Sequence, residues 1–295
     1  MTEVEYQRFG PWVLEINDRD TIPEIFQPHV KPIGTPLLSV KIPRPVERAK
    51  AKHLTHLYDF LISLYADRLT ILHRHGDSVT TDAVPYGQIE YLYSVHDLLY
   101  GCVHIATSTR VYEIPYSTVS SDLMCRVIDL VRRFYAESDR TLSVEQADHA
   151  GGESLSIYFS NLLDDELSRN PDLRVLASQV ETPIADHETS RPRRFVARVT
   201  GRRLLESLHL TDGRELVIIN RGQTYRHGKQ AVYARHTLYL PLSRIRSAEW
   251  RRPTGESPLT DLVLRTTQSV FTHRFLVNNR WRDHYKSFLR NVAGR

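Results

Sequence analysis

The chain contains little cysteine and no long apolar run. Its two cysteines among 295 residues, Cys102 and Cys125, stand at no spacing that binds zinc or forms a redox pair. This excludes a disulfide framework and a cysteine-based zinc module, and we expect both residues to be buried free thiols. The longest apolar runs, such as Leu216–Ile219, fall far short of the roughly 18 residues that cross a bilayer. The sequence therefore predicts no membrane-spanning helix.

The motifs of common enzyme classes are also missing. Gly151-Gly152 precedes no strand–helix unit and lacks the lysine of a phosphate-binding loop. No nucleophile stands in a G-x-S-x-G turn. Asp164-Asp165-Glu166 point to different faces of a predicted helix over 156–169, so they cannot act as an acid and base pair, and we interpret them as its solvated face. The sequence predicts a non-enzymatic protein with no cofactor and no catalytic residue.

Histidine pairs occur without a third metal ligand. His53 and His56 lie three residues apart, and His73 and His75 flank Arg74. A zinc site needs three or four ligands in a fixed geometry, and none of these pairs has a further ligand at a suitable spacing. We therefore predict no metal site and interpret the histidines as solvent-facing strand and loop residues.

Length and composition are those of a globular chain with two domains. Hydrophobic residues make up 41% and charged residues 25% of the chain, which excludes global disorder and coiled coil. The length is about twice that of a typical domain. The N-terminus is acidic and aromatic, without the basic start and apolar core of a secretion signal. We therefore expect a cytoplasmic protein.

Charge is divided unevenly along the chain. Residues up to Ser190 include 17 Lys/Arg and 28 Asp/Glu, a net of −11, whereas residues from Arg191 onward include 22 and 7, a net of +15. A basic half is typical of a chain that meets nucleic acid, anionic lipid or an acidic protein face. Attraction between the two halves, within one chain or head to tail between chains, fits the same pattern.

A weak internal repeat runs through both halves in the same order. Each copy has an aliphatic run ended by proline, then a strand, a tight turn and a strand, and then a proline and an isoleucine at equal spacing before a further strand. Several matches in one order indicate a duplication. The matching segments are 37–43 and 175–180, 63–74 and 207–221, and 85–89 and 241–245.

Each copy ends in a predicted amphipathic helix. Five apolar residues recur at offsets 0, 4, 7, 8 and 11 in both copies, which is one stripe of an α-helix. Ser120 or Ser121 can cap the first helix, and Asn279 the second. The two stripes are Leu123, Val127, Leu130, Val131 and Phe134, and Trp281, Tyr285, Phe288, Leu289 and Val292.

This order of elements resembles the bacterial pleckstrin-homology-like (PH-like) domains. The resemblance rests on the element order, on Ile114–Ser120 running straight into a helix, and on Trp281, and it covers residues 24–137 and 156–292. It implies a mainly β (α+β) fold of two tandem units, each a small antiparallel barrel or sandwich closed by a C-terminal amphipathic helix. Leu123 replaces the helix tryptophan in the first unit.

The predicted organisation has four parts. A polar stretch containing Gly151-Gly152 separates the two units, and an extra strand or strap precedes the first. The boundaries are 1–23 for the N-terminal strap, 24–137 for the acidic first unit, 138–154 for the linker and 155–295 for the basic second unit.

Both copies place positive charge in one connection, between the first and second strand. In lipid-binding PH domains, as the resemblance implies, this loop holds anionic headgroups. Arginines on such a loop can form paired hydrogen bonds to phosphate oxygens. The candidate anion-binding residues are Arg44, Arg48, Lys50 and Lys52 in the first copy, and Arg191, Arg193, Arg194, Arg198, Arg202 and Arg203 in the second.

The sequence favours a binding or adaptor protein whose target is another protein. Recruitment to the inner membrane face through the basic loops is an alternative. Nucleic-acid binding by the basic unit is a further alternative, for which Trp250 beside the arginine pair Arg251-Arg252 is the aromatic candidate for base stacking. Self-association is compatible with the opposite charges of the two units.

Overall fold

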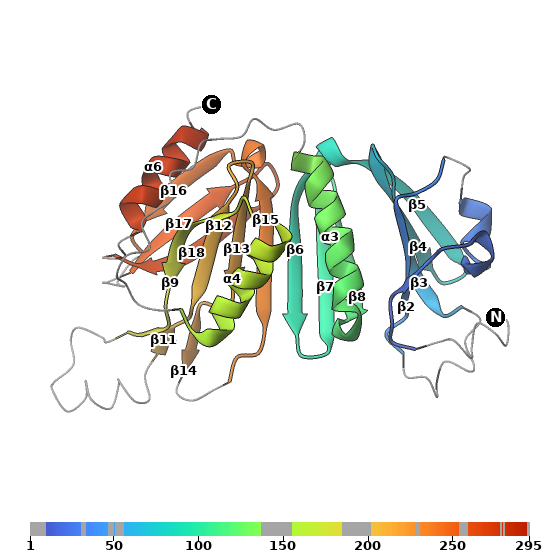
Figure 1. The fold of residues 1–295 in the computed structure, drawn as a ribbon, viewed down its shortest axis with the longest axis horizontal. Helices are drawn as coiled ribbons and strands as arrows, with labels where there is room; N and C mark the ends of the chain where they lie inside the picture. Colours follow the sequence, from blue (N-terminus) through green and yellow to red (C-terminus); the bar gives the residue numbers. More distant parts are fainter. Residues whose placement is uncertain are drawn as a thin grey trace. The chain divides into compact units, whose positions relative to one another are not determined.

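The chain divides into two compact units, Met1–Ser138 and Asp139–Arg295 (Figure 1). Unit 1 has 14 Lys/Arg and 17 Asp/Glu, and unit 2 has 25 and 18, so much of the acidic charge before Ser190 belongs to unit 2. The predicted linker lies outside the described residues. The computed structural model describes residues 10–30, 34–46, 50, 56–136, 155–184, 202–227, 231–253, 259–277, 279 and 281–293.

Unit 1 begins with a five-stranded antiparallel sheet in the order β1-β2-β3-β4-β5. Its central row, Val40, Ile62 and Ile71, is in register across β2, β3 and β4 and completely buried. Phe26 packs with Leu57 and other apolar residues of this sheet, so the segment before β2 covers part of it. The strands are β1 (Leu14–Glu15), β2 (Leu38–Pro43), β3 (Tyr58–Leu64), β4 (Arg68–His75) and β5 (Ser78–Pro85).

A second antiparallel sheet and a helix complete unit 1. The strands β6 (Ile89–Asp97), β7 (Tyr100–Thr107) and β8 (Val111–Ser117) pair in sequence order. The helix α3 (Ser121–Ala136) then contacts β3 of the first sheet. Burying a helix against strands stabilises it more than its intrinsic propensity does.

The helix α3 confirms the predicted helix but buries a different stripe. Val127 and Val131 are buried as expected, whereas Leu123, Leu130 and Phe134 are only half-buried. The reason is that the apolar arc of the helix is wider than the predicted stripe, since it also includes Met124, Ile128 and Tyr135. The stripe that faces the core consists of Met124, Val127, Ile128, Val131 and Tyr135.

Unit 2 also contains a four-stranded antiparallel arrangement. The strands β9 (Arg174–Gln179), β12 (Ser207–Thr211), β13 (Glu215–Asn220) and β15 (Arg235–Pro241) pair in this order. A small sheet of β10 (Thr182–Pro183), β11 (Arg202–Leu204) and β14 (Tyr225–His227) extends it at one end. A three-stranded sheet follows, made of β16 (Ser247–Arg251), β17 (Leu259–Arg265) and β18 (Val270–Leu276).

Proline ends the strand before a 3₁₀ turn in both units, β5 in unit 1 and β15 in unit 2. Pro85 precedes the 3₁₀ turn η3 (Tyr86–Gln88), and Pro241 precedes η5 (Leu242–Arg244). Both prolines adopt φ near −60°, the value that the pyrrolidine ring fixes. The next strand, β6 or β16, then begins, so the same local chemistry joins the two sheets in each unit.

The C-terminal helix α6 (Arg282–Ala293) buries the whole predicted stripe. Trp281, Tyr285, Phe288, Leu289 and Val292 all lie in the core. The helix contacts β9 and β16, which belong to the two sheets of unit 2. The predicted cap is also confirmed, because the Trp281 amide donates to Oδ1 of Asn279 at 2.9 Å.

The helix α4 (Ile157–Arg169) confirms the predicted helix over 156–169, with Ser156 as its N-cap. In Figure 1 it lies along the strands of unit 2 near β13. The interpretation of Glu166 as part of a solvated face is wrong. Its carboxylate is buried, accepts from Tyr239 Oη at 3.1 Å and pairs with Arg169.

An aromatic and histidine cluster fills the core between β12, β18 and α6. His209 is completely buried, and its Nδ1 lies 3.0 Å from the Tyr285 hydroxyl. Phe275 and His273 contact the same imidazole ring, and Trp250 contacts Phe275 and Tyr285. Burial lowers the pKa of His273 to about 4 and, together with His273, lowers that of His209. Both rings are therefore neutral at pH 7.

The described strands form separate antiparallel sheets, so the mainly β class is confirmed, but no closed barrel is found among them. Cys102 is buried as expected and Cys125 is half-buried, since its position on α3 lies beside the buried stripe; neither forms a disulfide. Within the described residues, no helix is both long and apolar enough to cross a membrane.

Candidate functional site

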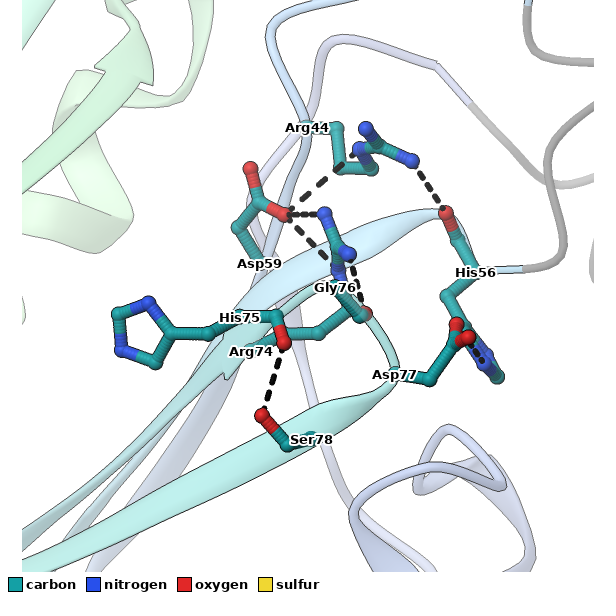
Figure 2. A network of polar contacts seen from close by, with 8 residues as sticks. All are labelled: Arg44, His56, Asp59, Arg74, His75, Gly76, Asp77 and Ser78. Carbon is teal, nitrogen blue, oxygen red and sulfur yellow. Dashed lines mark hydrogen bonds and ion pairs between the residues drawn. The ribbon is translucent and has the colours of Figure 1, made fainter.

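An arginine–aspartate cluster lies at the base of the predicted basic loop in unit 1 (Figure 2). Asp59, on β3, accepts from Arg74 Nη2 at 2.5 Å and from Arg74 Nε at 3.1 Å through Oδ1. Arg44, just beyond β2, places its Nε 3.7 Å from the same oxygen and donates from Nη1 to the His56 carbonyl at 3.3 Å. One carboxylate therefore neutralises part of two guanidinium charges.

The β4–β5 turn completes this cluster. Arg74 Nη1 donates to the Gly76 carbonyl at 2.6 Å, and Ser78 Oγ donates to the His75 carbonyl at 2.8 Å. Gly76 adopts φ +65°, which an L-residue with a Cβ rarely tolerates. Because β2, β3 and β4 pair directly, Arg44, Asp59 and Arg74 reach one end of the sheet together (Figure 2).

Of the histidines predicted to face solvent, His75 is exposed as expected, His56 and His73 are half-buried, and His53 lies outside the described residues. His73 stacks on Phe60 with ring centroids 4.1 Å apart, and it also contacts His75 at 4.0 Å. Burial, followed by the charge of His75, lowers the pKa of His73. His56 is half-buried with Nε2 3.9 Å from Asp77. No three His, Cys, Asp or Glu side chains in the described part of the chain are placed to hold a metal ion.

Unit 2 has a similar cluster beside its own basic connection. Glu181, between β9 and β10, pairs with Arg203 of β11 at 2.5 Å and with Arg226 of β14 at 2.5 Å. Arg203 and Arg226 are direct neighbours in the β11–β14 ladder, so without Glu181 their like charges would repel. In both units, a single carboxylate holds two arginines beside the connection that the sequence singled out.

A second ion pair extends the unit 2 cluster. Asp261 accepts from Arg274 Nε at 2.5 Å, and the guanidinium of Arg202 lies 4.1 Å from the centroid of the Tyr225 ring. Arg274 also donates to the Tyr225 hydroxyl. The hydrogen bond from Arg274 to Asp261 raises the pKa of Arg274 further, so its charge is permanent. These contacts fix the arginines in place.

The structure thus places some of the predicted anion-binding residues. Arg44 and Arg203 are held by carboxylates, Arg202 stacks on Tyr225, and Lys50 is exposed. The remaining candidates lie outside the described residues; they are Arg48, Lys52, Arg191, Arg193, Arg194 and Arg198.

Sequence reasoning missed an apolar hairpin tip in unit 1. Leu98 and Leu99 are the two residues between β6 and β7, since Asp97 pairs with Tyr100, and they are 68% and 71% exposed. Leu98 has φ +51°, a conformation that favours glycine or asparagine. Thr118 holds the turn: its amide donates to the Leu99 carbonyl at 3.1 Å and its hydroxyl to the Leu98 carbonyl at 2.6 Å.

We expect the Leu98→Gly variant to be more stable than the natural chain by about 0.5–1 kcal/mol, because relief of the left-handed strain exceeds the entropic cost of glycine. The exposed leucine contributes little burial that could be lost. Urea denaturation of both proteins measures the difference. Leu98→Ala retains the Cβ and serves as the matched control, and an equal gain in both variants would contradict the explanation.

Comparisons with known proteins give little further identification. No family model matches the chain, and no curated protein matches it. A solved structure to which the chain is similar is that of a DUF1696 family protein with a pleckstrin-homology domain from Shewanella loihica PV-4. The identity is 12% and the TM-score 0.28, and the match covers 43% of this chain and 99% of that chain.

Proposed function

We propose that this chain is a non-enzymatic binding protein built from two PH-like units and that its target is another protein. The tandem arrangement is supported by the element order that the two units share. In each, a set of antiparallel strands that ends in β5 or β15, a proline-led 3₁₀ turn and three further strands precede a C-terminal helix. Repeats of this kind arise by duplication of one folding unit.

The observation that carries the proposal is the open edge of the first sheet. β5 pairs with β4 over all eight of its residues without a bulge, and it has no other strand partner within the described residues. Most of its side chains are exposed, and it contains neither lysine nor arginine. Natural edge strands are normally protected by charges, proline, bulges or short length. β5 is long and has no bulge; its single charge, Asp82, is paired with Arg110, and its proline stands at its last position. Such an edge fits the addition of a partner strand.

The arginine clusters weaken the lipid alternative. Asp59 and Glu181 already accept from or pair with Arg44, Arg74, Arg203 and Arg226, so a headgroup at these four arginines would compete with a carboxylate. Trp250 likewise weakens the nucleic-acid alternative. It is half-buried against Phe275 and Tyr285 and does not form an exposed stacking platform.

Lysines on the β5 edge are expected to abolish partner binding. Thr81→Lys with Ala83→Lys adds two charges to exposed edge positions, which should reduce retention of a partner at least about tenfold, since strand addition depends on unhindered main-chain hydrogen bonds. Gln88→Lys with Thr109→Lys is the matched control, because both positions are exposed in unit 1 but lie outside β5. Quantitative affinity capture from the native host compares the three proteins.

The same proteins are sedimented with vesicles of phosphatidylcholine alone or mixed with phosphatidylserine. Retention of one protein by the natural chain and the control, but not by the edge variant, supports the proposal. Equal retention by all three would contradict strand addition at β5. Binding only to anionic vesicles, abolished by Arg191→Glu, Arg193→Glu and Arg194→Glu together, would replace the proposal with membrane recruitment.

A further inference from the structure

Further exposed apolar residues stand in segments that are hydrogen-bonded to one another near the Leu98–Leu99 tip. Tyr100 at the start of β7 and Val119 in the 3₁₀ turn η4 (Thr118–Ser120) are each 54% exposed. The two hydrogen bonds from Thr118 bring η4 against the tip. Trp12 is 48% exposed and precedes Val13, whose amide donates to the Ser120 hydroxyl at 2.9 Å. Three separate segments that meet at η4 therefore each carry exposed large apolar residues.

The backbone of the Leu98–Leu99 tip can enter an apolar environment at low cost in free energy. A buried carbonyl without a hydrogen bond costs free energy, but Thr118 satisfies the carbonyls of both Leu98 and Leu99. The same bonds keep the strained turn in one conformation, so little ordering entropy would be lost on binding. Strain of this kind at an exposed position, maintained by its surroundings, is a feature of functional sites.

The charged residues near the tip indicate whether its apolar partner is a membrane or a protein pocket. In the segments that border the tip, residues 12–16, 95–100 and 116–126, the carboxylates are Glu15, Asp97 and Asp122, and the only arginine or lysine is Arg126. Arg126 pairs with Glu15 at 2.7 Å. Two carboxylates remain uncompensated by these segments, so an anionic membrane surface would repel the tip, whereas basic side chains would attract it.

We propose that the Leu98–Leu99 tip is an anchor that inserts into an apolar pocket of a partner protein whose rim carries lysine or arginine side chains. The proposal rests on the proposed protein-binding function and adds a surface and the chemistry of the partner. Leu98 and Leu99 supply the buried contact, and Asp97 and Asp122 face the basic rim. β5 and the tip are separate surfaces of unit 1, and each can be tested alone.

Site-specific photocrosslinking locates the contact. The photoreactive amino acid p-benzoylphenylalanine is placed at Leu99, at Thr81 on β5, or at Val270 on β18 as a matched exposed control in unit 2. Crosslinking is carried out in cells of the native host. The proposal requires a protein adduct at Leu99 that is absent at Val270. That protein is then identified, purified and titrated with the intact chain.

Two variants of the chain, titrated in the same way, test the leucine contact and the acidic charge separately. Leu98→Gly with Leu99→Ser is expected to weaken the affinity about tenfold to a hundredfold, the range that corresponds to losing buried leucine surface. Asp97→Lys should also weaken binding and reduce its dependence on salt. Unchanged affinity of both variants would overturn the proposal.

Several outcomes distinguish failure of the anchor from failure of the proposed function. An adduct at Thr81 but none at Leu99 overturns the anchor and leaves protein binding at β5 intact. No adduct at either position contradicts both. An adduct of the chain with its own second copy, or vesicle binding that the tip variant abolishes, overturns the partner assigned here. The stability of the tip variant is measured in parallel, so loss of folding is recognised.

Discussion

Acidification is expected to destabilise unit 2 strongly. The neutral imidazole of His273 is favoured in the folded state, where its pKa is about 4, compared with 6.5 when unfolded. Between these values the unfolded chain binds more protons, so the free energy of unfolding falls as pH decreases. The loss attributable to His273 is on the order of 3 kcal/mol by pH 4. His209 acts in the same direction, since its pKa is also lowered.

The surroundings explain why these rings stay neutral. His209 faces Tyr285 of α6 and both His273 and Phe275 of β18, and no carboxylate is among these neighbours. The Nε2 atoms of His209 and His273 are buried without a hydrogen-bond partner in the described structure. Protonation would thus place a charge next to aromatic rings, with no acceptor at either Nε2 atom to stabilise it.

Urea denaturation between pH 7.5 and pH 4.5 tests this expectation. The chain has three tryptophans, and Trp12→Phe leaves Trp250 and Trp281, both in unit 2, as fluorescence reporters. In that background, His273→Phe should flatten the decline in stability below pH 6.5. His29→Gln, in the 3₁₀ turn η2 (Gln27–His29) of unit 1, is the control and should retain the natural slope. Parallel curves for all three proteins would refute the role of the buried imidazole.

The two C-terminal helices show what the sequence could and could not predict. Both were found from the same five apolar offsets, yet α6 buries all five residues and α3 buries only Val127 and Val131 of its set. Apolar residues are confined to one side of α6, so only one orientation buries them. In α3 they also include Met124, Ile128 and Tyr135, and a sequence pattern cannot choose between two overlapping stripes when tertiary packing decides.

Neither the Asp59 cluster nor the Leu98–Leu99 tip could be predicted from a local sequence pattern. Arg44 and Asp59 stand 15 residues apart, and strand register decides that they meet. A search for basic loops therefore found Arg44 but not the carboxylate that holds it. The Leu98–Leu99 turn escaped detection because turns are recognised by glycine, asparagine or proline, and this one contains none of them. Two leucines in a tight turn, where glycine or asparagine is usual, are the feature that distinguishes this site.

Removal of the Asp59 charge is expected to have the second large effect. Asp59→Ala leaves the guanidinium of Arg74, whose side chain is 10% exposed, without its anionic partner, and breaking such a pair typically costs about 3 kcal/mol. Arg74→Met in the same chain should recover much of this loss, because an apolar side chain of similar length needs no partner. Hydrogen exchange of the β3 and β4 amides measures the stability of unit 1 in all variants.

The conservative variant Asp59→Asn connects this cluster to function. It keeps an acceptor at Oδ1 but removes the negative charge, so Arg44 and Arg74 then carry their full positive charges at the base of the basic loop. If the natural carboxylate suppresses anion binding, Asp59→Asn should bind phosphatidylserine vesicles more strongly than the natural chain, and added salt should abolish the difference. Equal, negligible binding by both proteins would show that these arginines serve the fold alone. Strong binding by the natural chain, unaffected by the substitution, would instead place the lipid contact elsewhere and favour membrane recruitment over a protein partner.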